Sequence, residues 1–127
     1  MPAPIPTQVH YHRKARELEI GYAGGESHRL SIEYLRVYSP SAEVRGHGKD
    51  QAVLQVGKKD VGLANITQTG NYALKLHFDD GHDSGLYSWE YLYDLIQHRE
   101  AYWADYLRRL ENAGARRDTL GIELKQL

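Results

Sequence analysis

Cysteine is absent from this chain of 127 residues. Its absence excludes disulfide bonds, thiolate nucleophiles and every zinc or iron–sulfur site that needs sulfur ligands. Phenylalanine is also scarce, with one residue against ten tyrosines and two tryptophans. Tyrosine must therefore supply much of the aromatic packing. We expect its hydroxyls to find hydrogen-bond partners at the margin of the core.

Neither sign of charge is in excess, since 16 Lys and Arg face 17 Asp and Glu and the formal net charge is −1. This balance gives no electrostatic case for binding nucleic acid or an anionic membrane. No run approaches the ~20 apolar residues that span a bilayer, and the first residues lack the pattern of a signal peptide. We expect a cytoplasmic protein with no membrane partner and no nucleic-acid partner.

The length predicts one domain. Prolines at positions 2, 4 and 6 predict an extended arm over residues 1–7. The patterned part of the chain predicts a single domain over 8–114. Residues 115–127 are charged and weakly patterned, so we expect a loosely held tail.

Short stretches of alternating apolar and polar residues predict strands over 8–12, 17–22, 27–30, 71–79 and 84–87. Two dipeptides that favour tight turns, Gly24-Gly25 and Asp80-Gly81, predict the hairpin turns. Within the clearest strand, alternate side chains would share one face: Tyr72, Leu74, Leu76 and Phe78.

Two serines are expected to cap helices: Ser31 before a short one over 32–37, and Ser88 before a long pattern that ends at Gly114. A polar stretch at 97–100 allows either one bent helix or two shorter ones. Apolar and aromatic residues recur at helical spacing, which is more typical of a core than of a stacking surface. They are Trp89, Leu92, Leu95, Ile96, Tyr102, Trp103, Tyr106, Leu107 and Leu110.

Two parts of the chain, 18–35 and 74–92, repeat a similar pattern of strand, turn, strand, capping serine and helix. Both end in Ser-x-Glu-Tyr-Leu. We predict a duplicated ββα unit within an α+β fold. Its architecture would be a two-layer sandwich with a mainly antiparallel sheet and helices on one face. The alternative is coincidence among residues common in hairpins.

Three polar groupings are candidates for chemistry. His10 and His12 would share a strand face and so could chelate a metal, although a simple surface pair is the more ordinary interpretation. Residues 79–83 combine three acids with His82, but acids at a turn are usually solvated. Around His47, flanking glycines and two cations suggest an anion-binding loop, although a flexible loop is more common. No sequence signature of a hydrolase, a zinc protease or a dinucleotide-binding fold is present.

Two long motifs are distinctive: residues 34–47, and residues 70–73 together with 78–92. They resemble the DUF971 family, which is similar to the N-terminal domain of gamma-butyrobetaine hydroxylase. The resemblance covers about residues 8–118. It implies a small α+β module without the separate jelly-roll domain that holds the catalytic iron in those hydroxylases. The chain is therefore expected not to be an enzyme.

The resemblance also implies where a structural zinc would be bound. The Leu35-Arg36 motif matches, but the three family cysteines fall on Ser39, Ser41 and Val44, and the distant histidine falls on His82. One ligand of four is kept, and a lone imidazole does not make a closed tetrahedral site. We therefore expect the family-type zinc site to be missing.

Similar domains occur fused to P-loop ATPases of iron–sulfur assembly. This implies a stand-alone, non-catalytic accessory domain that binds a partner protein, in an iron–sulfur or oxidoreductase system. The expected binding residues are Arg36, Ser39, Ser41, Arg45, His47, Lys49 and Asp83.

Two other functions stay open. One is a metal-binding protein that holds iron or zinc through His82, with Asp83, His47 or His77 as further ligands. The other is a module that binds a small molecule or nucleic acid through Arg45, Lys49 and nearby aromatic residues.

Overall fold

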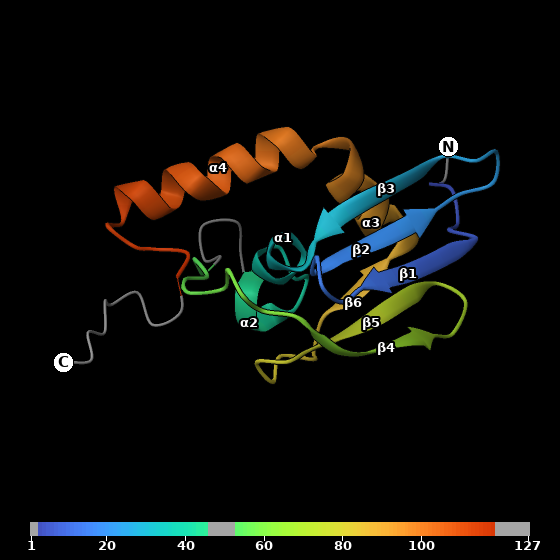
Figure 1. Ribbon diagram of the computed structural model, residues 1–127, viewed down its shortest axis with the longest axis horizontal. Helices are drawn as coiled ribbons and strands as arrows, with labels where there is room; N and C mark the ends of the chain where they lie inside the picture. The colour runs from blue at the N-terminus through green and yellow to red at the C-terminus, as the bar shows by residue number, and fades with distance from the viewer. Residues whose placement is uncertain (1–2, 46–52, 119–127) are drawn as a thin grey trace.

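The computed structural model describes residues 3–45 and 53–118. Within these residues the chain forms two three-stranded antiparallel sheets and four α-helices (Figure 1). The first sheet contains β1 (Gln8–His12), β2 (Glu17–Gly21) and β3 (Ser27–Ser31) in that order. The second contains β4 (Leu63–Thr69), β5 (Ala73–Phe78) and β6 (Leu86–Ser88).

The predicted turns are formed by glycines with left-handed backbone. Gly24 and Gly25 join β2 to β3 with φ values of 92° and 89°. Gly81, with φ 91°, lies in the longer connection between β5 and β6. Residues without a side chain reach this region at no steric cost, which is why these positions turn the chain.

Both predicted capping serines begin helices. Ser31 Oγ accepts the backbone N–H of Tyr34 at the start of α1 (Ile32–Val37), at 3.1 Å. Ser88 Oγ accepts that of Tyr91 at the start of α3 (Trp89–Gln97), also at 3.1 Å. A short helix, α2 (Ala42–Arg45), follows α1.

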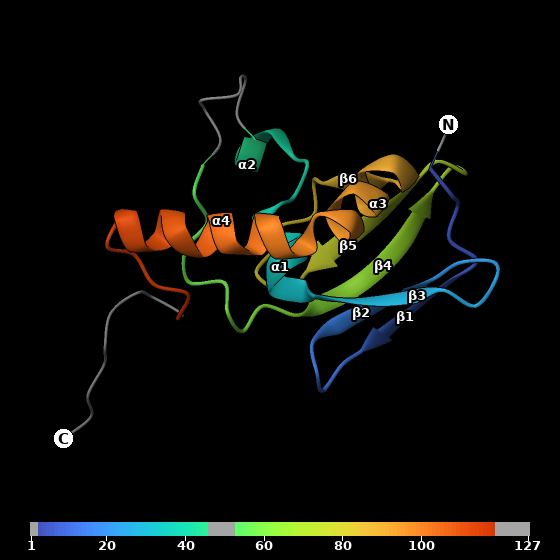
Figure 2. The ribbon, with the colours of Figure 1, turned by 90° about the horizontal axis from the view of Figure 1, so that it is seen from above.

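The C-terminal helical pattern forms two helices. His98 separates α3 from α4 (Arg99–Asn112). Gly114 ends the pattern with φ 64°, as predicted. Figures 1 and 2 both place α4 across α1. Two buried contacts join these helices: the rings of Tyr34 and Trp103 meet edge to face, and Tyr106 bonds to Glu33.

One core is shared by the two sheets and by α1 and α3. Inward side chains of β2 and β3 meet those of β5, and α1 and α3 close the space. Its most buried apolar members are Leu18, Ile20, Leu30, Ile32, Leu35, Leu76, Leu92 and Leu95. The core is therefore built from the alternating residues that predicted the strands.

Tyrosine is deeper in the structure than the sequence suggested. Tyr34, Tyr87 and Tyr106 are almost fully buried. The hydroxyls of Tyr34 and Tyr87 donate to the carbonyls of Leu95 (2.7 Å) and Leu35 (2.5 Å). Burial raises the pKa of all three tyrosines. These hydroxyls therefore join elements inside the core.

The α+β class and the antiparallel pairing are confirmed, with the strands divided between two sheets. The element order βββα occurs twice, but the duplicated unit itself stays a prediction. Two residues expected inside are outside: Tyr72 precedes β5 and is 55% exposed, and Leu107 on α4 is 38% exposed. Tyr72 lies one residue before β5, so its side chain need not follow the alternation of that strand. On α4 only Tyr106 and Leu110 are buried, so Leu107 falls outside the buried stripe.

Candidate functional site

The candidate site is a buried corner where the segment after α1 meets the β5–β6 connection. Its central contact is a hydrogen bond of 2.8 Å between Ser39 Oγ and His82 Nε2. Ser39 is fully buried and His82 is 6% exposed. The His82 ring also lies against Phe78, with centroids 5.9 Å apart. We call Ser39, Ser41, His82, Ser84 and Gly85 the Ser39–His82 corner.

Two further hydrogen bonds close the corner. The backbone N–H of Ser41 donates to Ser39 Oγ at 3.3 Å, and the hydroxyls of Ser41 and Ser84 are bonded at 2.7 Å. A Cβ atom added to Gly85 would lie 2.4 Å from Ser39 Oγ and 3.2 Å from Pro40 Cδ. The two segments therefore approach so closely that only glycine fits at position 85.

The corner's donor atoms do not fit the family-type zinc. The sequence resemblance implied ligands at Ser39, Ser41, Val44 and His82. Ser39 offers His82 a neutral hydroxyl, and Val44 is a buried apolar side chain. Structural zinc is bound by thiolates and imidazoles in sets of four, and this set offers one imidazole. Hydrogen bonds and packing hold these segments together.

A charged cluster lies beside the corner. Asp80 Oδ2 accepts from Arg36 Nε at 2.9 Å and from Lys58 Nζ at 2.8 Å, while Oδ1 accepts from the His82 backbone at 3.2 Å. Arg36 also donates to Gln55 at 3.0 Å. Burial acts to raise the pKa of Asp80. The hydrogen bonds from Lys58 and His82 and the charge of Arg36 outweigh it and hold this pKa below its ordinary value.

The structure brings some predicted site residues together and separates others. Arg36, Ser39, Ser41 and His82 belong to the corner and its charged cluster and are all buried. Arg45 is exposed on α2, where it donates to the Tyr91 hydroxyl at 3.1 Å and lies over that ring.

Asp83 is exposed, and its Oδ2 atom lies 3.9 Å from His77 Nδ1. His47 and Lys49 lie outside the described residues. The assignment of these residues as a binding site stays a prediction.

The ion pairs of Asp80 with Arg36 and Lys58 were not predicted from the sequence. An Asp-Gly turn suggests a solvated carboxylate, yet Asp80 pairs with cations 44 and 22 residues away. Gln55, Lys58 and Ser84 were missed in the same way. No local pattern reports such distant contacts. The one sequence signal for the Asp80 ion pair was the Leu35-Arg36 motif, because an arginine buried beside a core leucine needs a carboxylate nearby.

The chain matches the family described as gamma-butyrobetaine hydroxylase-like, N-terminal, over residues 9–93. The chain belongs to this family. None of the curated proteins compared with the chain matches it.

Several solved structures resemble the domain. Two are solution NMR structures at 48% identity, with TM-scores of 0.82 and 0.79 and at least 98% of both chains covered. A third is the crystal structure of a DUF971 protein of unknown function from Acidithiobacillus ferrooxidans. It is 34% identical with a TM-score of 0.56, over 72% of this chain and 92% of the other. Among the described helices, none is long and apolar enough to cross a membrane.

Proposed function

We propose that this domain is a non-catalytic accessory module that binds a partner protein next to the Ser39–His82 corner. Ser39, Ser41 and His82 are buried and so give the surface its shape rather than contact the partner. The contacts would come from exposed residues around them: Arg45 on α2, Asp83 in the β5–β6 connection, and the segment 53–58.

The observation that carries the proposal is the exposure of two apolar side chains in that segment. Val53 is 54% exposed and Val56 is 46% exposed. Between and after them, Gln55 bonds to Arg36 and Lys58 bonds to Asp80, which fixes the segment against the charged cluster. Apolar side chains held rigidly outward among charged groups are typical of a protein interface.

The partner's identity is proposed from the family resemblance alone. Similar domains occur fused to ATPases of iron–sulfur assembly, so proteins of iron–sulfur or oxidoreductase systems are the first partners to test. Arg45 offers an exposed cation and Asp83 an exposed anion, which favours a partner surface carrying both signs of charge.

The test is quantitative affinity capture from the native cell extract with wild-type protein, Val56→Lys and Tyr72→Lys. Tyr72 is a matched control because it is a similarly exposed apolar residue at the β4–β5 turn. We expect Val56→Lys to lose the captured partner and Tyr72→Lys to keep it. Equal capture by all three proteins would contradict the proposal.

The alternative, a metal centre around His82, has less support. His82 Nε2 is bonded to Ser39, and Asp83 faces His77 instead of the His82 ring. Within the described part of the chain, the cluster of three metal-ligating side chains lies elsewhere. A metal held by His82 stays a prediction for direct measurement.

A further inference from the structure

A second group of metal-type ligands lies on the outer face of the first sheet. We propose that His10, His12 and Glu19 form a binding site for a divalent transition-metal cation, with zinc as its reference ligand. The site is independent of the proposed partner surface, because it lies on β1 and β2. It uses the histidine pair that the sequence singled out and adds a carboxylate that the sequence did not connect to it.

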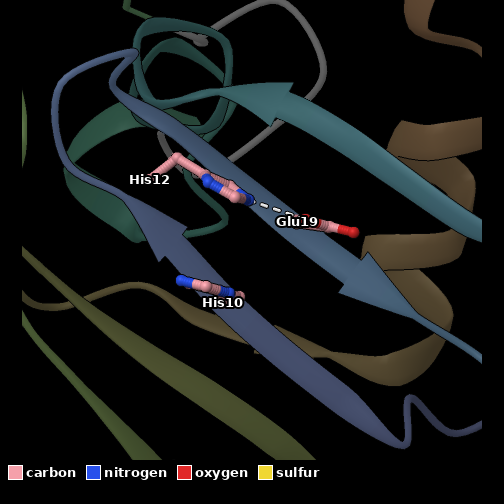
Figure 3. Close-up of side chains that lie close together, drawn as sticks. All are labelled: His10, His12 and Glu19. Carbon is pink, nitrogen blue, oxygen red and sulfur yellow. Dashed lines mark hydrogen bonds and ion pairs between the residues drawn. The ribbon is translucent and has the colours of Figure 1, made fainter.

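The strand register brings the three side chains together. His10 and His12 are two residues apart on β1, so both point to the same face of the sheet. In the antiparallel ladder His10 pairs directly with Glu19 on β2. Figure 3 shows the His10 and His12 side chains on β1, with a dashed line that joins the His12 ring to the Glu19 carboxylate on β2. Antiparallel pairing thus supplies the third ligand.

The distances are close to those that a metal requires. One ligand atom from each residue lies within 4.8 Å of the other two. His12 Nε2 is 2.6 Å from Glu19 Oε1, and the two imidazole rings stack with centroids 4.4 Å apart. Zinc bound at ~2.1 Å needs neighbouring ligand atoms about 3.4 Å apart in a tetrahedron. Small side-chain rotations on an exposed sheet face therefore suffice.

Neighbouring residues orient the Glu19 carboxylate. The Ser27 hydroxyl donates to Glu19 Oε2 at 3.1 Å, which leaves Oε1 facing His12. Glutamate is ordinarily an anion at neutral pH, which suits it to bind a cation. Arg29 is the cation nearest in register, but its guanidinium bonds to Glu17 at 3.0 Å. A hydrogen bond like that from Ser27 to Glu19 is typical of the outer shell that orients metal ligands.

The ligand set indicates the chemistry of the ion. Two imidazoles and one carboxylate match the three-ligand sets of zinc sites that keep a fourth position open. Imidazole nitrogen also excludes Mg²⁺ and Ca²⁺ as preferred ions, since these take oxygen ligands. The open position would hold water or a donor from a second molecule. Because the ligands are partly exposed, we expect moderate affinity rather than a structural zinc.

The test is a zinc titration of the full chain, with any affinity tag removed, against a chromogenic zinc chelator. The variants are His10→Gln, His12→Gln and Glu19→Gln. His98→Gln is the matched control. His98 Nδ1 lies 2.9 Å from Asp94 Oδ1, but these two residues do not belong to the group of three ligands. Circular dichroism verifies that each variant is folded.

We expect one zinc per wild-type chain, affinity about tenfold or more weaker in each of the three variants, and affinity within twofold of wild type in His98→Gln. Zinc should also raise the thermal midpoint of the wild type but not of His12→Gln. Wild-type protein that binds no zinc at millimolar concentration would overturn the proposal. Binding that is equal in His12→Gln and wild type would overturn it too.

Discussion

Asp80 is the residue that ties three distant segments together. Its carboxylate accepts from Arg36 on α1, from Lys58 in the segment before β4, and from the backbone of its own turn. Arg36 is 7% exposed, so loss of the carboxylate would leave a buried cation without its partner. Charged groups in this situation are costly to leave unpaired. The turn chemistry of Asp80-Gly81 predicted the bend but not this pairing, because its partners are far away in sequence.

Replacing Asp80 with Asn is expected to lower the free energy of unfolding by about 1–3 kcal/mol near neutral pH. The folded-state pKa of Asp80 is lowered, so its stabilisation is present above the unfolded-state pKa and is lost as pH falls through the folded-state value. The difference between wild type and Asp80→Asn should therefore shrink below about pH 4. Urea unfolding across acidic and neutral pH measures it.

Asp83→Asn is the control for that experiment, since Asp83 is an exposed acid three residues away. It should change stability little at any pH. A loss in Asp80→Asn that stays constant down to the lowest pH would show that the charge of Asp80 is not what stabilises the fold.

At the scale of elements, the caps and turns were predictable because they depend on adjacent residues. Ser31 and Ser88 begin their helices, and Gly24 and Gly114 adopt left-handed backbone, as their residue types require. The division of six strands into two sheets was not predictable. Alternation indicates which side chains face inward, but it does not say which strand lies beside which.

The Ser39–His82 corner shows the same limit. The family resemblance placed Ser39 and His82 in one site. No local sequence pattern indicates that Gly85 lies against Ser39. Gly85→Ala should destabilise the domain by about 1–3 kcal/mol, because its Cβ would overlap Ser39 Oγ. In the Ser39→Ala background the same change should cost less. Chemical denaturation of the two single variants and the double variant measures this coupling. Strictly additive effects would contradict the proposed close contact.

At the scale of the whole molecule, the segment after α4 is joined to the first helix, α1, through Arg117. Glu33 on α1 is 5% exposed and accepts two bonds from Arg117, at 2.8 and 2.7 Å, and one from Tyr106 at 2.8 Å. The hydrogen bond to Glu33 is the largest cause of the raised pKa of Arg117. The predicted domain end at 114 stays a prediction, although the described part of the tail makes these contacts.

Arg117→Ala is expected to destabilise the domain by about 1–3 kcal/mol, since it leaves the buried Glu33 carboxylate with fewer donors. Arg116→Ala is a matched control, because Arg116 is exposed and pairs with Asp118 in the same segment. Thermal unfolding of both variants compares them. An equal effect of the two substitutions would argue against a specific bond between the tail and α1.

Hydrogen bonds among Ser39, Ser41, His82 and Ser84 hold the Ser39–His82 corner, and we propose that a bound cation lies on the β1–β2 face. The most direct measurement is NMR of the histidine ring nitrogens during a zinc titration of the full chain, with Ser39→Ala to identify the His82 signals. We expect zinc to shift the signals of the His10 and His12 ring nitrogens and to leave those of His82 unchanged. A zinc-dependent shift of the His82 ring nitrogens, with His10 and His12 unmoved, would contradict it.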